Sequence, residues 1–205
     1  MTVNVLMLSP GFPKDLGYFT QGLAKVGANV YGIGDSPLGA LDPEVREALT
    51  DYRQVPTLWD PDALVDEVRT WMRGKPIDRA ECLWEPGMEV VAAIREAFEL
   101  PGLTVAQSEA FRDKEKMKQV LDAAGIRTPH HYRATTAAQV VEAAETIGYP
   151  VIVKPIAGAG SESTYRVESR EALDAVLPAL RSIQEVSVEE FVEGDDMTFE
   201  TISVG

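Results

Sequence analysis

The sequence predicts an α/β protein with two parts. Over residues 1–107, apolar runs of strand length alternate with segments whose apolar residues recur at helical spacing. This alternation is typical of a mainly parallel sheet that is covered on both faces. At Ser108 the order changes to helix, strand, helix, hairpin and helix, which predicts a smaller α+β unit.

The first part opens with a strand, a helix and a second strand. Val3–Leu8 is continuously apolar and ends at Ser9–Gly11, as expected of a strand buried on both faces. Asp15 can cap the helix that follows, Gly27 can end it, and Asn29–Ile33 predicts the second strand. The further elements expected are a helix at Pro43–Leu49, a strand near Tyr52–Val55, a helix from Asp60 to Gly74, a strand at Ala80–Trp84, a helix from Met88 to Phe98 and a strand at Leu103–Ala106.

Two loops of this part are candidates for ligand binding, because ligands on parallel sheets bind at the carboxyl ends of the strands. Ser9–Lys14 and Glu85–Glu89 each follow a predicted strand, and Glu85 could either orient a substrate or be a solvated loop carboxylate. A dinucleotide site is a further alternative. The first loop carries one glycine where the dinucleotide fingerprint needs three, although Asp35 falls near the expected distance.

The second part is predicted to begin with a helix that Ser108 caps and Gly125 ends. Its apolar stripe is expected to pack inward and consists of Ala110, Met117, Leu121 and Ala124. Lys114 falls within the stripe, so it should meet an anion, extend along the apolar surface to solvent, or pair with the neighbouring Asp113 or Glu115. Lys116 and Lys118 lie outside the stripe or at its edge, and we expect both to be solvated.

The remaining elements complete a small sheet with helices. Those expected are a strand at Thr128–Ala134, a helix from Thr135 or Thr136 to Gly148, a strand at Val151–Lys154, a return strand at Thr164–Glu168, a helix capped by Ser169, and strands at Val186–Val192 and Met197–Val204. His130 and His131 are adjacent in a strand, where neighbouring side chains point to opposite faces, so they are not expected to bind one metal together.

The stretch from Tyr149 to Ser161 is a candidate phosphate site. A β-branched run delivers Lys154 to its end, and a glycine-bearing loop follows. A lysine supplies a mobile positive charge, and glycines let backbone N–H groups approach an anion closely. The alternative is a hairpin whose lysine ends a strand in solvent.

The composition excludes several classes of function. The chain has 19 Lys and Arg against 33 Asp and Glu, a net charge of −14, so broad attraction to nucleic acid or anionic lipid is not expected. No apolar run approaches the length of a membrane span, and Met1–Leu8 lacks the features of a secretory leader, so we expect a cytoplasmic protein. The single cysteine, Cys82, permits no internal disulfide and is expected to be a core residue.

The ordered motifs of the chain resemble the ATP-grasp superfamily. The resemblance rests on Asp113-Lys114, Met117, Gly125-Ile126 and Pro129, on the segment Gly148–Pro155, on the loop Gly158–Ser161, and on the segment Glu189–Asp196. It implies a Rossmann-like pre-ATP-grasp domain at residues 1–107, the small ATP-grasp subdomain at 108–186, and the beginning of the large subdomain at 187–205. The Mg²⁺ ligands of such a fold are expected beyond Gly205, and the chain is therefore expected to be part of a longer enzyme.

The resemblance also implies roles for individual residues. Lys114 and Lys154 would hold the phosphates of ATP, and Gly158, Ala159, Gly160 and Ser161 would cover them. Glu189, Glu190, Phe191 and Val192 would line the adenine, largely through backbone groups, and Asp196 would bind the ribose hydroxyls. No protein nucleophile is implied.

The implied reaction is ATP-dependent ligation of a small-molecule carboxylate. The carboxylate attacks the γ-phosphate of ATP to form an acylphosphate, and an amine or another nucleophile then displaces phosphate. Three alternatives remain open: a bicarbonate-activating enzyme of the carboxylase or carbamoyl-phosphate synthase kind, a non-catalytic nucleotide-binding or interaction module, and an NAD-linked oxidoreductase. Homodimers are common among proteins of this kind, so a homodimer is a further possibility.

Overall fold

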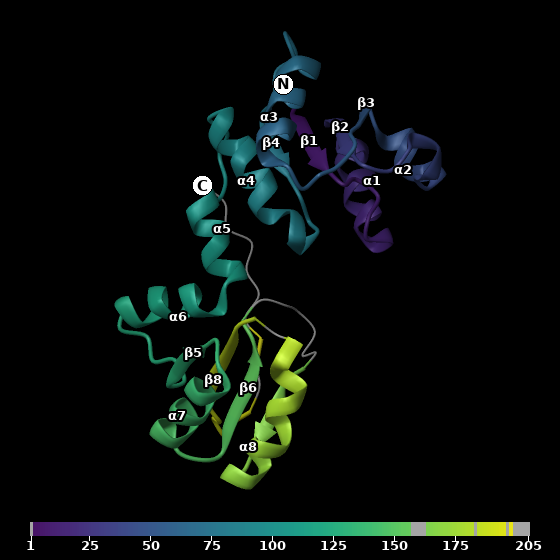
Figure 1. Ribbon diagram of the computed structural model, residues 1–205. Helices are drawn as coiled ribbons and strands as arrows, with labels where there is room; N and C mark the ends of the chain where they lie inside the picture. Colours follow the sequence, from purple (N-terminus) through teal and green to yellow (C-terminus); the bar gives the residue numbers. More distant parts are fainter. Residues whose placement is uncertain (1, 157–162, 183, 196, 199–205) are drawn as a thin grey trace. The chain divides into compact units, whose positions relative to one another are not determined.

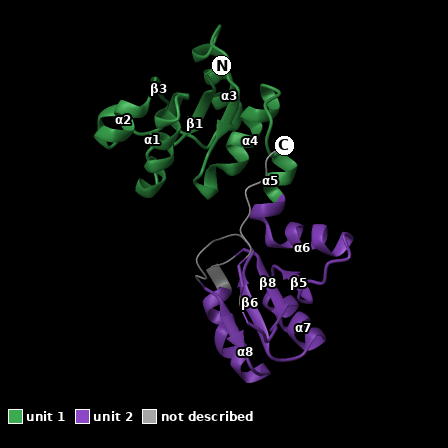
Figure 2. Ribbon diagram, turned by 180° about the vertical axis from the view of Figure 1, so that it is seen from behind, with its two compact units in different colours: residues 1–109 green, residues 110–205 purple. Residues whose placement is uncertain are grey.

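The computed structural model describes residues 2–156, 163–182, 184–195 and 197–198 of the chain. These residues form two compact units, residues 1–109 (unit 1) and residues 110–205 (unit 2) (Figure 2). The sequence placed a boundary between residues 107 and 108. The further division at residue 186 stays a prediction.

Unit 1 is built on a parallel four-stranded sheet of the order β3-β2-β1-β4. Its strands are β1 (Asn4–Leu8), β2 (Asn29–Gly34), β3 (Asp51–Gln54) and β4 (Arg79–Glu81). Its helices are η1 (Lys14–Leu16), α1 (Gly17–Lys25), η2 (Leu38–Ala40), α2 (Pro43–Ala48), α3 (Pro61–Trp71), η3 (Glu85–Gly87) and α4 (Met88–Ala97). Figure 1 shows α1 and α2 on one side of the sheet and α3 and α4 on the other, so the expected parallel sheet with two covered faces is confirmed.

The core of unit 1 follows from the apolar runs of the sequence. Every residue of β1 is buried, and Leu6 and Leu8 pack with apolar residues of α3 and α4 such as Leu64 and Ile94. Cys82 is buried in this core, and burial raises the pKa of its thiol above the ordinary value. Its expected role as a core residue is confirmed.

The strand expected at Leu103–Ala106 is wrong, because helix α5 (Val105–Arg112) begins within it. Thr104 and Gln107 explain the difference. The Gln107 backbone N–H donates to the Thr104 hydroxyl at 3.2 Å, and the Thr104 backbone N–H donates to the Gln107 side-chain oxygen at 2.9 Å. These reciprocal bonds satisfy donors at the start of a helix, and they outweigh the strand preference of a short apolar run.

Unit 2 contains an antiparallel four-stranded sheet of the order β5-β8-β6-β7 (Figure 1). Its strands are β5 (His131–Ala134), β6 (Val151–Pro155), β7 (Tyr165–Val167) and β8 (Val186–Glu190), and its helices are α6 (Lys114–Ala123), α7 (Ala137–Ile147), α8 (Arg170–Val176) and η4 (Leu177–Ser182). One face of the sheet forms an apolar core with α7 and α8, to which Val153, Val188 and Leu173 contribute. The expected hairpin of β6 and β7 is confirmed. Most of the expected strand Met197–Val204 lies outside the described residues.

The single helix expected from Ser108 to Ala124 is two helices. Asp113 separates α5 from α6 with an extended backbone, and its carboxylate accepts hydrogen bonds from the backbone N–H groups of Glu115 and Lys116 at 2.8 and 3.1 Å. An aspartate in this position caps the new helix.

The expected orientation of this helix is also wrong. Met117, assigned to the inward stripe, is 39% exposed, whereas Lys118, expected in solvent, is 3% exposed. The buried residues of α6 are Glu115 and Lys118. They are buried because they meet polar partners on β8, as described below.

Among the described residues, no helix is long and apolar enough to cross a bilayer.

A buried ionic cluster as the candidate functional site

The polar face of the unit 2 sheet carries the candidate site. On β8, Val186 and Val188 point into the apolar core, so Ser187 and Glu189 point to the opposite face. Lys154 of β6 is paired directly with Ser187 in the register, and it therefore shares this face. Helix α6 contributes to the same face through the side-chain contacts of Glu115 and Lys118.

Glu189 lies at the centre of the cluster. Its carboxylate accepts one hydrogen bond from Lys118 Nζ at 2.5 Å and forms an ion pair with Lys154 Nζ at 2.7 Å. Lys118 Nζ also lies 3.4 Å from a Glu115 carboxylate oxygen and 3.3 Å from the Ser187 hydroxyl. The Ser187 hydroxyl in turn donates to Glu115 Oε1 at 2.6 Å. Each buried charge therefore has a partner of opposite sign, as burial requires.

The electrostatics of the cluster favour the charged form of Glu189. Burial raises the pKa of Glu189, but the hydrogen bonds and charges of Lys118 and Lys154 together outweigh burial and hold this pKa below its ordinary value of 4.5. Glu189 and Lys118 are buried, whereas the Lys154 side chain remains 24% exposed. Lys154 thus connects the buried cluster to the surface.

Lys114 meets the same sheet at the end of β6. It is the first residue of α6, and its ammonium donates to the carbonyl oxygen of Ile156 at 3.2 Å. Ile156 directly follows β6 and precedes the glycine-bearing loop. The two lysines assigned to phosphates, Lys114 and Lys154, therefore belong to elements that meet where the loop begins.

The predicted adenine residues lie in different surroundings. Glu189 faces the lysines, whereas the Glu190 carboxylate accepts from Arg127 Nη2 at 2.8 Å and from the His130 backbone N–H at 3.1 Å. These interactions, led by the His130 backbone bond, lower the pKa of Glu190. The Arg166 guanidinium lies 3.9 Å from the ring centroid of Phe191.

The other predicted nucleotide contacts are Val192, the glycine-bearing loop and Asp196. Val192 is exposed. Gly158, Ala159, Gly160, Ser161 and Asp196 lie outside the described residues. The role of all these residues in holding a nucleotide stays a prediction.

Sequence reasoning missed Glu115, Lys118, Ser187 and the cluster contact of His131. His131 Nε2 lies 3.4 Å from Glu115 Oε2, whereas the Ser187 hydroxyl donates to Glu115 Oε1. One signal was available: Ser187 and Glu189 alternate with valines in a strand, which predicts a polar face that needs partners. The helix pattern alone gave no reason to choose Lys118 as that partner.

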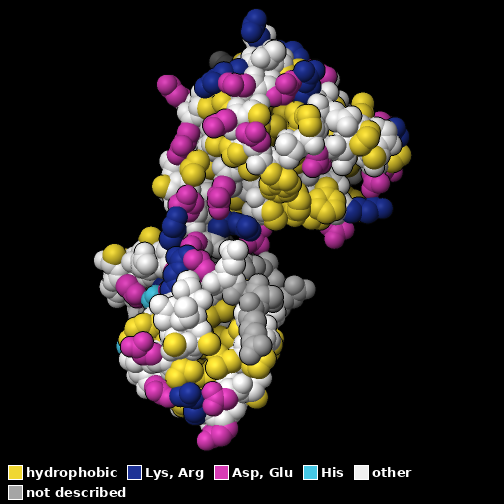
Figure 3. All heavy atoms as spheres, viewed as in Figure 1, with side chains coloured by type: hydrophobic (Ala, Val, Ile, Leu, Met, Phe, Trp, Pro, Cys, Tyr) yellow, Lys and Arg dark blue, Asp and Glu magenta, His cyan; other side chains and the backbone are white. Residues whose placement is uncertain are grey.

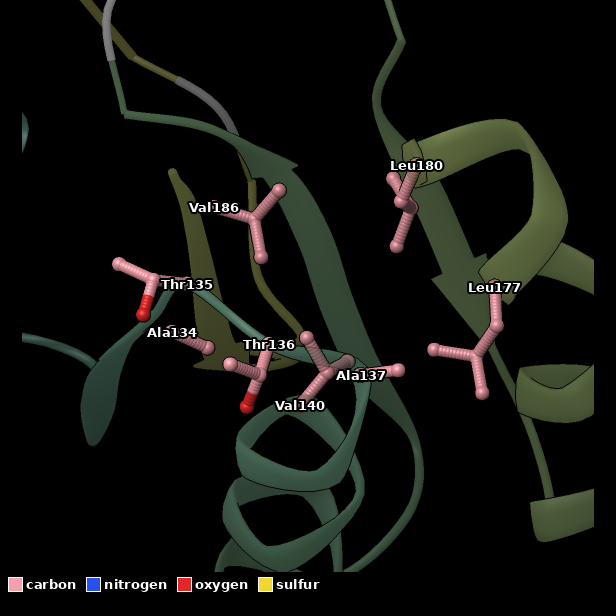
Figure 4. A pocket seen from close by; sticks show the side chains of 8 residues that line it. All are labelled: Ala134, Thr135, Thr136, Ala137, Val140, Leu177, Leu180 and Val186. Carbon is pink, nitrogen blue, oxygen red and sulfur yellow. The ribbon is translucent and has the colours of Figure 1, made fainter. Parts of the chain in front are cut away.

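Unit 2 also contains a small pocket that carries no charged side chains. It has a volume of about 120 Å³, and Figure 4 shows side chains from the start of α7, from η4 and from β8 around it. Its lining consists of Ala134, Thr135, Thr136, Ala137, Val140, Leu177, Leu180 and Val186. None of these residues carries a titratable side chain, so the pocket offers no group for acid, base or phosphate chemistry.

The comparison with protein families decides the classification of unit 2. Residues 111–205 match the family model of the ATP-grasp domain. These residues belong to the ATP-grasp superfamily. The match includes α6, the unit 2 sheet and the buried ionic cluster.

Two curated relatives are D-alanine–D-alanine ligases. That of Clostridium perfringens strain SM101 is 40% identical over 88 residues, which cover 42% of this chain and 29% of the relative. That of Xylella fastidiosa is 37% identical over 115 residues, which cover 53% of this chain and 38% of the relative. The aligned segments thus span less than two fifths of the length of either relative.

A solved structure resembles nearly the whole chain. The L-amino acid ligase from Bacillus licheniformis matches with a TM-score of 0.71 and 24% identity over 94% of this chain and 45% of that protein. An N5-carboxyaminoimidazole synthetase from Staphylococcus aureus complexed with ADP matches with a TM-score of 0.67 and 18% identity. At these identities the likeness establishes the fold: the sheets of both units match the N-terminal portion of ATP-grasp enzymes.

Proposed function

We propose that this chain provides the ATP-binding part of a ligase that joins a small-molecule carboxylate, most simply an amino acid, to an amine. The observation that carries the proposal is Lys154, which is held at the edge of a buried ionic cluster and is partly open to solvent. The names of the amino-acid ligases among the relatives support the substrate class.

Lys154 is suited to binding a phosphate. An ammonium has three donors, so Lys154 can keep its bond to Glu189 and still donate to a phosphate oxygen. Because Lys118 also pairs with Glu189, the carboxylate does not depend on Lys154 for its charge balance. Lys114 adds a second cation near the end of β6. Lysines gathered at one place in a protein of net charge −14 favour a compact anion over an extended one.

The reaction that fits these groups proceeds in two steps. A carboxylate oxygen bonds to the γ-phosphorus of ATP, the bond from that phosphorus to the β,γ-bridging oxygen breaks, and ADP leaves. The amine then attacks the acyl carbon, loses a proton and displaces inorganic phosphate. Lysines contribute by neutralising charge on the transferred group and by alignment rather than by covalent chemistry.

Magnesium is a separate question. Among the described residues no group of three His, Cys, Asp or Glu side chains could hold a metal ion. No step above is assigned to a metal that these residues hold.

Calorimetry with a non-hydrolysable ATP analogue and Mg²⁺ tests the assignment of Lys154. Replacing Lys154 with alanine should weaken binding about tenfold or more, since a hydrogen bond to a charged group contributes roughly 1.5–3 kcal/mol. Glu189 keeps Lys118 as its partner, so the variant should stay folded. The matched control is Lys116→Ala, an exposed residue on α6 that should bind the analogue like the wild type. Equal affinity of Lys154→Ala and wild type would remove Lys154 from the site.

A second measurement separates a ligase from a nucleotide-binding module. Phosphate release from ATP should require both a carboxylate substrate and an amine, because the acylphosphate forms on the first and is consumed by the second. Binding of the analogue without such dependent release would support the non-catalytic alternative. Release that depends on bicarbonate in place of the carboxylate would support a bicarbonate-activating enzyme.

A further inference from the structure

Unit 1 exposes an aromatic cluster that the ATP chemistry does not use. It consists of Phe12, Trp59 and Trp84, called the aromatic rim below. The Phe12 and Trp84 ring centroids lie 4.9 Å apart, and those of Trp59 and Trp84 lie 5.3 Å apart, both edge to face. Phe12 is 54% exposed and Trp59 is 49% exposed. Figure 3 shows hydrophobic side chains gathered on the visible face of unit 1 between α4 and α1.

The three rings come from three separate loops on one edge of the sheet. Phe12 follows β1, Trp59 follows β3 and Trp84 follows β4. All three strands are parallel, so their carboxyl ends lie at the same edge. The rim is therefore a surface cluster to which three loops contribute, rather than one isolated exposed side chain.

The position of the rim on this edge is informative. From β1 the chain goes to β2 and β3 on one side, and later to β4 on the other side. The neighbours β1 and β4 therefore enclose the point at which the strand order reverses, and open α/β sheets bind ligands in the crevice at this point. Phe12 and Trp84 belong to the two loops that flank it.

Local structure holds these loops in place. The Phe12 backbone N–H donates to the Ser9 carbonyl at 3.3 Å, and the Ser9 hydroxyl donates to the Phe12 carbonyl at 3.2 Å. Ser9 adopts a positive φ of 53°, a conformation that a non-glycine residue rarely adopts and that often occurs at functional sites. After Trp84, Gly87 lies so close to Cys82 that a Cβ would be 2.4 Å from its Sγ. Local contacts thus hold the backbone of both loops, and the rings contact each other edge to face.

The chemistry of the rim selects its ligand. Half-exposed rings held edge to face present apolar surface of the kind that contacts an apolar or aromatic group. Charges in these loops are mixed: Lys14 forms an ion pair with Asp42 at 3.6 Å, and Asp15 and Glu85 are acidic. A phosphate or other polyanion would find no concentration of positive charge here.

We propose that the aromatic rim binds the side chain of an amino-acid substrate, and that this side chain is aromatic or large and aliphatic. The inference rests on the proposed function, because it names the substrate class of the same ligase. An apolar side chain of this size would cover the exposed surface of the rings. Glycine and alanine are too small to do so and are therefore not expected as preferred substrates at this position.

Tryptophan fluorescence of the 205-residue chain tests the inference without ATP. The protein has three tryptophans, and Trp71 lies apart from the rim, where its indole donates to Asp51. A Trp71→Phe background therefore leaves only Trp59 and Trp84 as reporters. Titration with L-phenylalanine and with L-leucine should give a saturable change, and L-alanine should bind about tenfold more weakly or worse.

Variants connect the signal to the rim. Phe12→Ala in the same background should weaken L-phenylalanine binding about fivefold or more, because it removes one exposed ring and retains both reporters. Lys116→Ala, on the exposed face of α6, should leave this titration unchanged. Because the titration contains no ATP, failure of the rim assignment and failure of the ATP assignment can be told apart.

Three results would overturn the inference. The first is the absence of a saturable response to L-phenylalanine, and the second is an equal response to L-alanine. The third is tryptophan fluorescence that changes with protein concentration in parallel with the molecular mass measured by sedimentation. That result would show that the rim is a contact between copies of the chain.

Discussion

Replacing Lys118 with methionine is the sharpest test of the buried ionic cluster. The ammonium of Lys118 meets Glu189 at 2.5 Å, Ser187 at 3.3 Å and Glu115 at 3.4 Å. Methionine keeps an unbranched apolar side chain but removes the charge. The variant therefore leaves two buried carboxylates with one cation fewer.

The expected loss can be bounded in two ways. Breaking a buried ion pair by removing one partner costs roughly 3–5 kcal/mol. A carboxylate can instead take up a proton. With an ordinary pKa of 4.5 for glutamate, this costs about 3 kcal/mol near pH 7. The cheaper route limits the effect, and Lys154 still pairs with Glu189. We therefore expect the variant to lose about 2–3 kcal/mol near pH 7.

The pH dependence follows from the same argument. In the wild type, the pKa of Glu189 in the folded state lies below 4.5, so its contribution to stability is present above pH 4.5 and is lost as the pH falls through the folded value. In the variant, protonating a carboxylate costs less as the pH falls. The difference in unfolding free energy between the two proteins should therefore shrink towards about pH 4.

Urea unfolding followed by two probes measures this difference. All three tryptophans lie in unit 1, so fluorescence follows unit 1, whereas far-UV circular dichroism follows both units. Lys118→Met should shift the transition in circular dichroism and leave that in fluorescence unchanged. Lys116→Met is the control on the exposed face of α6 and should change stability by less than about 0.5 kcal/mol. If Lys118→Met also stayed within about 0.5 kcal/mol of wild type near pH 7, the buried cluster would not have the role described.

Three further predictions concern single contacts. Glu189→Gln should be less stable than wild type near pH 7. Thermal melts should show the two proteins converging only as the pH falls below about 4.5 and through the lowered pKa of the folded carboxylate; a constant difference would contradict the lowered pKa. Gly87→Ala should lose roughly 1–3 kcal/mol of unfolding free energy, because its Cβ would lie 2.4 Å from Cys82 Sγ. Gly22→Ala, whose Cβ would meet nothing within 4 Å in α1, is the control and should gain roughly 0.5–1 kcal/mol. If urea unfolding showed the reverse order of stability, the close packing at Gly87 would be refuted. Asp113→Ala should cost about 1 kcal/mol, since it removes the cap of α6, and hydrogen exchange should be faster at the first turn of α6 if the cap acts as described.

The sequence by itself determined the architecture of both units. Runs such as Val3–Leu8 predict buried strands because the hydrophobic effect depends on composition and spacing, and these are local properties. Capping residues such as Ser169 and the glycines that end helices placed most of the helices. The hairpin that carries Lys154 was predicted for the same reason. Where local signals conflict, as at Leu103–Ala106, a short apolar run cannot distinguish a strand from a helix.

Only the tertiary structure decided the environment of the charged residues. A helical pattern states which side chains of α6 share a face, but not which face meets the sheet. Lys118 is buried because Glu189 lies 71 residues further along the chain and is brought to it by strand β8. The free energy of a buried charge depends on its partners in space rather than on its neighbours in sequence. The sequence pattern therefore predicts a solvated Lys118, and only the fold brings the carboxylates of Glu115 and Glu189 close to it.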